Sequence, residues 1–129
     1  MLVFVSSPFS ADTQQGKANN AGFAARLCEY VAHNYANVVP IAPHIICSQW
    51  WNDYDHRDLA INYCKNLLSK CNALFVYAEV SPTAGMKMEI KQAETMGIPI
   101  RYIYDKQLNS PPMPDLKLVP FTVLVSDKF

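Results

Sequence analysis

The sequence predicts an α/β protein whose core is a mainly parallel sheet of four or five strands between two layers of helices. Two observations predict this fold class. Short apolar runs alternate with longer segments in which apolar residues recur at helical spacing. The run at 74–77 is apolar throughout, which is typical of a strand covered on both faces. Alternating strands and helices favour parallel pairing with right-handed crossovers.

The first strand is expected at residues 2–5, because the apolar run there is closed by two serines and a proline. A polar loop at 10–17 follows, and a helix is expected from about 19 to 34. Its apolar residues fall on one face: Phe23, Ala24, Leu27, Cys28 and Val31.

The next two elements are a strand at 38–41, ended by Pro43 and His44, and a helix at about 55–69. An aromatic loop that contains Trp50 and Trp51 joins them. The spacing of apolar residues predicts that the inner face of this helix consists of Leu59, Tyr63 and Leu67, with Cys71 just beyond it.

The second half begins with the buried strand at 74–77 and continues with a helix at 83–96. That helix is expected to bury Met86, Ile90 and Ala93 and to stop at Gly97, which suits a left-handed cap. A strand at 98–104 comes next. Residues 105–120 are rich in Pro, Asn and Ser and are expected to be irregular, and 121–125 is expected to be a strand at the sheet edge.

Composition limits the class of function. The 129 residues fit a single domain, half of them are hydrophobic, and eleven basic residues balance eleven acidic ones. A neutral chain without a Lys/Arg cluster lacks the electrostatic footprint of a nucleic-acid binder. No apolar stretch approaches the ~20 residues of a membrane span, and the N-terminus is too short and uncharged for a secretory signal. We therefore expect a cytoplasmic protein with neither a nucleic-acid nor a membrane partner.

The four cysteines, Cys28, Cys47, Cys64 and Cys71, include no C-x-x-C pair. Together with the scattered histidines they show no zinc-ligand spacing, so no metal site is expected. Three of them lie in segments that read as helical and are expected to be packed thiols. Cys47 is in a loop, and its role stays open.

Polar and small residues follow three predicted strands, at the sheet edge where open α/β sheets bind ligands. They are Ser6, Ser7, Pro8 and Phe9 after the first strand, Pro43 and His44 after the second, and 81–85, with Ser81, Thr83 and Gly85, after the third. Hydroxyls, free helix N–H groups and small residues favour an anionic or sugar-bearing ligand. The sequence therefore predicts a small-molecule site at this edge.

Glu89 is the most informative residue of this edge, because it lies one turn into a helix that begins just past a strand end. Each candidate also has an ordinary structural explanation. A helical Glu is usually a solvated surface residue, Thr83 can serve only as an N-cap, and His44 can be a hydrogen-bonded structural residue. The two serines can simply form turns. Their convergence at one edge favours a site.

The segment AEVSPTAGMKMEI at 78–90 resembles the signature of the nucleoside 2-deoxyribosyltransferase superfamily. Its closest characterised group is the 2′-deoxynucleoside 5′-monophosphate N-hydrolases, in which a strand ending AEV precedes Ser-x-Gly-x-x-x-Glu. Thr83, Gly85 and Glu89 occupy those positions. The chain also resembles small phage and bacterial members of the superfamily. That likeness rests on VFVSSPF at 3–9, VPIAPH at 39–44, Arg57, CNALFVY at 71–77, GM at 85–86 and EI at 89–90.

The resemblance implies a Rossmann-like three-layer sandwich and a homodimer or larger assembly. It also implies an N-glycosidase or deoxyribosyltransferase that acts on a nucleoside or nucleotide without a cofactor. Glu89 would be the nucleophile, as in retaining glycosidases. The sugar or its 5′-phosphate would be held by the loop after the first strand and by the turn at 83–85. Asp53, Ser81 and Met86 complete the expected substrate contacts.

The chain departs from the family pattern at the proton donor. The family's Asp on the helix before the third strand corresponds to 62–65, which holds no carboxylate. Asp58 and His44 are the candidate replacements, with Asp53 and Asp55 as further possibilities. The family's aromatic hydroxyl on the first strand is also missing, since Val3 and Phe4 stand there, and Asn72 replaces the Asp usual before the third strand.

The rival hypothesis is a non-catalytic protein that sequesters or senses a nucleotide on the same fold. A carboxylate or imidazole within hydrogen-bonding range of a bound base favours an enzyme. A pocket walled instead by Trp50 and Trp51 favours a binder, although these tryptophans can equally pack against another subunit. A purely structural assembly protein is the third, less favoured class.

Overall fold

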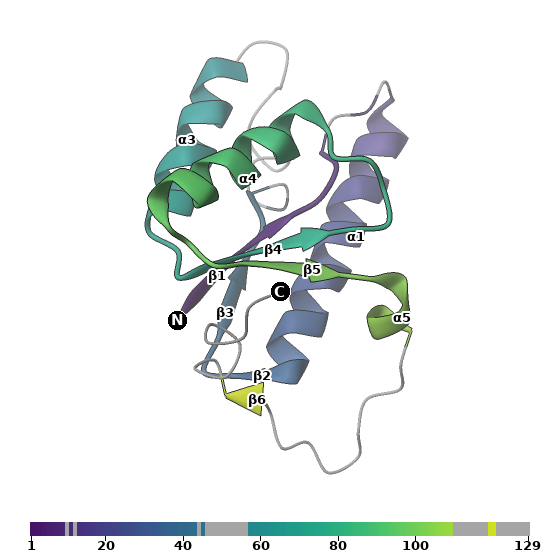
Figure 1. The fold of residues 1–129 in the computed structure, drawn as a ribbon. Helices are drawn as coiled ribbons and strands as arrows, with labels where there is room; N and C mark the ends of the chain where they lie inside the picture. Colours follow the sequence, from purple (N-terminus) through teal and green to yellow (C-terminus); the bar gives the residue numbers. More distant parts are fainter. Residues whose placement is uncertain (10, 12, 44, 46–56, 110–118, 121–129) are drawn as a thin grey trace.

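The computed structural model describes residues 1–9, 11, 13–43, 45, 57–109 and 119–120. Helices cover both faces of a central sheet (Figure 1). In chain order the elements are β1 (Leu2–Ser6), α1 (Gln14–Asn34), β2 (Tyr35–Ala36), β3 (Val39–Ile41), α3 (Arg57–Ser69), β4 (Ala73–Tyr77), α4 (Ala84–Met96), β5 (Ile100–Ile103), α5 (Asp105–Leu108) and β6 (Val119–Pro120).

The main sheet has four strands in the order β3-β1-β4-β5, and every pairing in it is parallel. The predicted α/β class is therefore confirmed. The register between the two central strands places Ser6 beside Val76, so β1 and β4 finish at the same edge. A separate parallel pair of β2 and β6 lies away from this sheet (Figure 1).

Alternation along the strands divides the core into two layers. Odd-numbered residues such as Val3, Val5 and Phe75 pack with Leu27 and Val31 of α1. Even-numbered residues of β1 and β4 pack with α3 and α4 in a second cluster, which includes Phe4, Leu74, Val76, Leu68, Met86 and Ala93. An even-numbered residue at the end of β1 therefore points toward the α3/α4 layer.

The sheet has a topological switch point between its two central strands. The chain leaves β1 through α1 to reach β3 on one side, and then crosses through α3 to β4 on the other side. Right-handed crossovers in opposite directions place α1 and α3 on opposite faces, as the two core clusters confirm. The loops after β1 and β4 consequently diverge at this edge, which is where such folds bind ligands.

Helix α4 matches the predicted helix at 83–96 to within one residue, since it spans Ala84–Met96. The Thr83 hydroxyl accepts a hydrogen bond from the Met86 backbone N–H at 3.2 Å, which makes Thr83 the N-cap. At the other end Gly97 adopts a left-handed conformation with φ of 70°, and its N–H bonds to the carbonyls of Ala93 and Glu94. The capping prediction for Gly97 is confirmed.

Helix α1 begins earlier than the sequence pattern suggested. The prediction placed its start near residue 19, whereas the helix starts at Gln14. The cause is an N-cap at Thr13, whose side chain accepts a hydrogen bond from the Gly16 N–H at 2.9 Å. Polar residues that looked like a loop therefore form the first turn.

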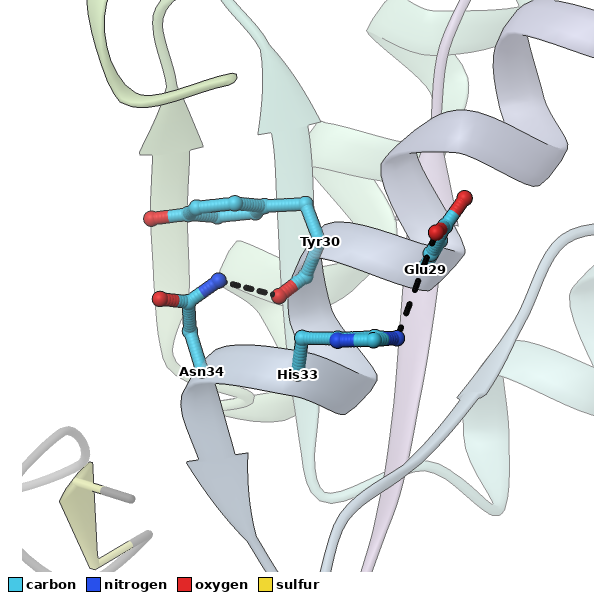
Figure 2. A network of polar contacts seen from close by, with 4 residues as sticks. All are labelled: Glu29, Tyr30, His33 and Asn34. Carbon is cyan, nitrogen blue, oxygen red and sulfur yellow. Dashed lines mark hydrogen bonds and ion pairs between the residues drawn. The ribbon is translucent and has the colours of Figure 1, made fainter. Parts of the chain in front are cut away.

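The last turns of α1 carry a small polar network (Figure 2). The Asn34 side-chain amide donates to the Tyr30 carbonyl at 2.7 Å, and His33 lies 4.0 Å from the Glu29 carboxylate. This end of α1 leads directly into β2, so the network stands at the amino end of the sheet. It therefore lies at the C-terminal end of α1, at the sheet edge opposite to that of the predicted site.

Two predictions about the remaining elements are corrected. Leu59 is not on the inner face of α3, because 53% of its surface is exposed while Ala60 and Leu68 are buried. Within 105–120, residues 105–108 form α5 and 119–120 form β6, so this stretch is not irregular throughout. The Tyr77 hydroxyl donates to Asp105 Oδ1 at 2.6 Å and fixes the start of α5. The predicted strand at 121–125 lies outside the described residues. Among the described helices, none has the length and apolar character that a bilayer crossing requires.

Candidate active site

A hydrogen bond between Ser6 and Glu89 joins the first strand to α4 across the switch point. The Ser6 Oγ donates to Glu89 Oε1 at 2.9 Å. Ser6 is the last residue of β1, its exposed fraction is 0%, and its even position points it toward α4. Two of the predicted site residues, far apart in the sequence, are therefore in direct contact.

The environment of Glu89 changes the acidity of its carboxyl group. Burial raises the pKa of Glu89 to about 7, against the smaller, opposing effect of the Ser6 hydrogen bond. The residue keeps part of its surface exposed, but its carboxyl group is largely enclosed. Near neutral pH the neutral and the ionised forms of this carboxyl group are therefore both expected. A carboxyl group with a perturbed pKa at a ligand-binding edge is typical of functional sites.

The loop after β1 directly follows Ser6 and is held in place by packing and by one hydrogen bond. Ser7 is 2% exposed, whereas Pro8 and Phe9 are partly buried. The Phe9 carbonyl accepts a hydrogen bond from the Asn20 side chain at 3.0 Å, so the loop is tied to α1. The loop therefore holds a defined position beside the end of β1.

The first turn of α4 is open at Gly85. This glycine is exposed and helical, and a Cβ placed on it would meet Thr83 Oγ1 no closer than 3.9 Å. Neither the backbone nor the packing of the protein therefore requires glycine there. Met86 next to it is 1% exposed and packs in the second core cluster, where it anchors the turn. Ser81 is exposed in the preceding loop.

Among the described residues, no candidate proton donor is seen in contact with Glu89. Asp58 lies in the first turn of α3 and is exposed. His44 and Asp53 lie outside the described residues, as do Asp55 and both tryptophans of the aromatic loop. Asn72, which replaces the family's Asp, is at the opposite sheet edge, where its Oδ1 accepts from the Leu2 N–H at 2.8 Å.

Sequence reasoning missed a second polar cluster, on the α1 side of the same edge. The Tyr77 hydroxyl donates to Asp105, and the Asp105 N–H donates to Glu79 Oε1 at 3.1 Å. The hydrogen bond to Asp105 is the main cause that raises the pKa of Tyr77 to about 12. The sequence positions could have indicated this cluster, because Tyr77 ends β4 and Asp105 follows β5, which is the neighbour of β4 in the sheet.

Within the described part of the chain, no group of three or more His, Cys, Asp or Glu side chains is placed to hold a metal ion. Cys28, Cys64 and Cys71 form no disulfide with one another, and burial raises the pKa of Cys28 and of Cys71 to about 11. The expectation that these three cysteines are packed is confirmed for Cys71, which is buried, and partly for the other two. Cys47 lies outside the described residues.

Comparison with known proteins assigns the chain to a family. A family model described as "Domain of unknown function (DUF7768)" matches residues 1–103, and the chain belongs to this family. The match covers the whole four-stranded sheet and both residues of the Ser6–Glu89 contact. The comparison with curated proteins found no match.

A solved structure shares the fold. It is described as a 2-deoxyribosyltransferase from the psychrotolerant bacterium Bacillus psychrosaccharolyticus. The TM-score is 0.57 with 10% sequence identity, over 81% of this chain and 72% of that chain. At this identity the likeness shows the fold alone. The chain thus has the Rossmann-like fold of a nucleoside deoxyribosyltransferase, as the sequence resemblance predicted.

Proposed function

We propose that the protein cleaves or transfers the glycosidic bond of a nucleoside or nucleotide, with Glu89 as the nucleophile. One observation carries the proposal. The Glu89 carboxyl group lies at the switch point of the sheet, largely enclosed and hydrogen-bonded to the buried Ser6 hydroxyl. The shared fold with a 2-deoxyribosyltransferase supports the class of reaction.

The chemistry follows the scheme of retaining glycosidases. The ionised carboxylate attacks the anomeric carbon C1′, a C1′–O bond forms, and the C1′–N bond breaks. Its electron pair leaves with the base, which takes up a proton. Water then attacks C1′ of the glycosyl-enzyme and gives one proton to the group that protonated the base, which releases the free sugar and the carboxylate. A second base in place of water would yield a new nucleoside, so hydrolase and transferase share the first step.

The sugar side of the substrate is assigned to two segments next to Glu89. The loop at 7–9 directly follows Ser6, the partner of Glu89, and the α4 turn at 83–85 precedes Glu89 by about one helical turn. The N-terminal end of a helix favours an anion such as a 5′-phosphate. The absence of a Cβ at Gly85 leaves room for close approach to that turn. The leaving base is assigned a proton donor among Asp58, His44 and Asp53.

The direct test is release of free base from 2′-deoxynucleosides and their 5′-monophosphates, measured by chromatography. Glu89→Gln keeps the size of the side chain but removes the nucleophile, and we expect base release to fall by at least a thousandfold. Glu94→Gln is the matched control, because Glu94 is an exposed glutamate of the same helix. Undiminished release by Glu89→Gln would eliminate Glu89 as the nucleophile.

A nucleotide-binding protein without turnover is the second candidate, and the acidity of Glu89 favours it. With a pKa of about 7, Glu89 is protonated in a substantial fraction of the molecules near physiological pH. A protonated carboxyl group is a poor nucleophile but a good hydrogen-bond donor to a sugar hydroxyl. Calorimetric binding of deoxynucleotides without any base release would select this function over the enzyme.

A further inference from the structure

Ser6 was expected from the sequence to contact substrate, but its surroundings point to another role. Its side chain is fully buried, and its hydroxyl donates a hydrogen bond to Glu89 Oε1 at 2.9 Å. A buried hydroxyl that donates to a carboxylate favours the ionised form of that carboxylate. The same bond limits the rotation of the carboxyl group, because Ser6 is fixed by the parallel pairing of β1 with β4.

We propose that Ser6 is the positioning residue of the nucleophile: its hydroxyl holds Oε1 of Glu89 and thereby directs Oε2 toward C1′ of the substrate. This inference rests on the proposed function. The first strand has no aromatic hydroxyl that could hold the carboxyl group, because Val3 and Phe4 stand there and pack into the two core clusters. A short hydroxyl at the strand end reaches the carboxylate instead.

The surroundings of Glu89 leave Ser6 as its polar partner among the described residues. Helix α4 packs against α3, β4 and β5. The titratable or charged residues described on these four elements are Asp58, Tyr63, Cys64, Lys65, Tyr77, Lys87, Lys91, Glu94, Arg101 and Tyr102. None of them is a cause of the pKa shift of Glu89, which comes from burial and from the Ser6 hydrogen bond.

The test uses a pair of variants that differ only in the hydroxyl. Ser6→Thr keeps the hydroxyl and Ser6→Val replaces it by a methyl group of the same shape, so both add the same bulk at a buried strand position. Ser6→Ala adds no bulk and serves where the larger side chains disturb folding. Ser69→Ala is the control, because the Ser69 hydroxyl also donates within the protein, to the Asn66 carbonyl at 2.6 Å, but at the end of α3.

Two readouts are measured in parallel. The pKa of Glu89 is followed by NMR in protein labelled with ¹³C-glutamate, with Glu89→Gln identifying the resonance. The pH profile of kcat/KM is measured with a deoxynucleoside that wild type cleaves. We expect Ser6→Val and Ser6→Ala to raise the pKa of Glu89, to move the acidic limb of the profile to higher pH, and to lower kcat/KM at pH 7 about tenfold through kcat. Ser69→Ala should match wild type, and Ser6→Thr should keep the pKa of Glu89 and most of the kcat/KM that Ser6→Val loses.

The positioning role would be overturned if Ser6→Thr and Ser6→Val lost kcat/KM equally, or if Ser6→Ala left the pKa of Glu89 unchanged. These results differ from failure of the proposed function, which shows as base release that survives Glu89→Gln. If no nucleoside is cleaved by wild type, the ¹³C titration decides alone whether Ser6 governs the carboxyl group, because it needs no turnover.

Discussion

At the scale of single residues, the protein combines burial and one hydrogen bond to set the state of Glu89. Burial disfavours the charged form, whereas the Ser6 hydroxyl favours it, and burial has the larger effect. The resulting pKa of about 7 lies near neutral pH. A modest change in pH or in the Ser6 contact therefore changes the ionised fraction of the Glu89 carboxyl group.

This acidity also predicts how stability depends on pH. The pKa of Glu89 is raised from 4.5 to about 7 on folding, so between these values the folded state binds more protons than the unfolded state. The free energy of unfolding should therefore fall as pH rises from 4.5 to about 7, by at most about 3 kcal/mol from this group, and be flat above.

Glu89→Gln removes that titration, and urea unfolding at pH 5 and pH 8 measures it. We expect the stability of Glu89→Gln relative to wild type to be greater at pH 8 than at pH 5. Glu94→Gln, with an exposed glutamate on the same helix, should follow wild type at both pH values. A wild-type slope in Glu89→Gln would show that the carboxyl group titrates normally in the folded protein.

At the scale of elements, α4 does two tasks at its N-terminal turn. Thr83 closes the turn as N-cap and Met86 fastens it to the core, while Gly85 between them stays exposed. The structure itself gives no packing reason for this glycine, because a Cβ would meet nothing closer than 3.9 Å. We assign the open space to the substrate.

Gly85→Ala separates the two tasks. Replacement of glycine by alanine inside a helix stabilises by about 0.5–1 kcal/mol, so the variant should unfold at slightly higher urea concentration than wild type. Its affinity for substrate should nevertheless fall at least tenfold in calorimetry, because the added methyl group occupies the approach to the turn.

Gly22→Ala is the matched control for this experiment. Gly22 is also a helical glycine, and a Cβ there meets nothing within 4 Å. It should gain similar stability and bind substrate as wild type does. Equal affinities of the two alanine variants would remove the first turn of α4 from the proposed substrate site.

At the scale of the whole molecule, the sequence was sufficient to predict the parallel sheet and the edge at which Ser6 and Glu89 meet. Strand and helix periodicities predicted the order of the main elements, and parallel pairing brought Ser6 and Glu89 to one edge as expected. The hydrogen bond between them follows from the alternation of side chains along β1, which points Ser6 toward α4. The sequence contains this alternation, but it becomes decisive only once the strand register is known.

Other features were beyond local patterns. Leu59 matches a helical period as well as Ala60 does, and only the docking of α3 on the sheet decides that Ala60 faces inward. The early start of α1 depends on the cap at Thr13, and α5 depends on a hydrogen bond from Tyr77 in another strand. The proton donor stays a prediction, since His44 and Asp53 lie outside the described residues and Asp58 is exposed.

The central claim is that Glu89 attacks the sugar, and trapping of the glycosyl-enzyme tests it most directly. A 2′-fluoro-2′-deoxynucleoside slows the second step by destabilising the positive charge that develops at C1′. Mass spectrometry of the intact protein and of its peptides then shows whether the sugar is attached and where. We predict one fluorosugar on Glu89, with release of an equal amount of base. A sugar attached to another residue, or turnover with no adduct on Glu89, would contradict the account.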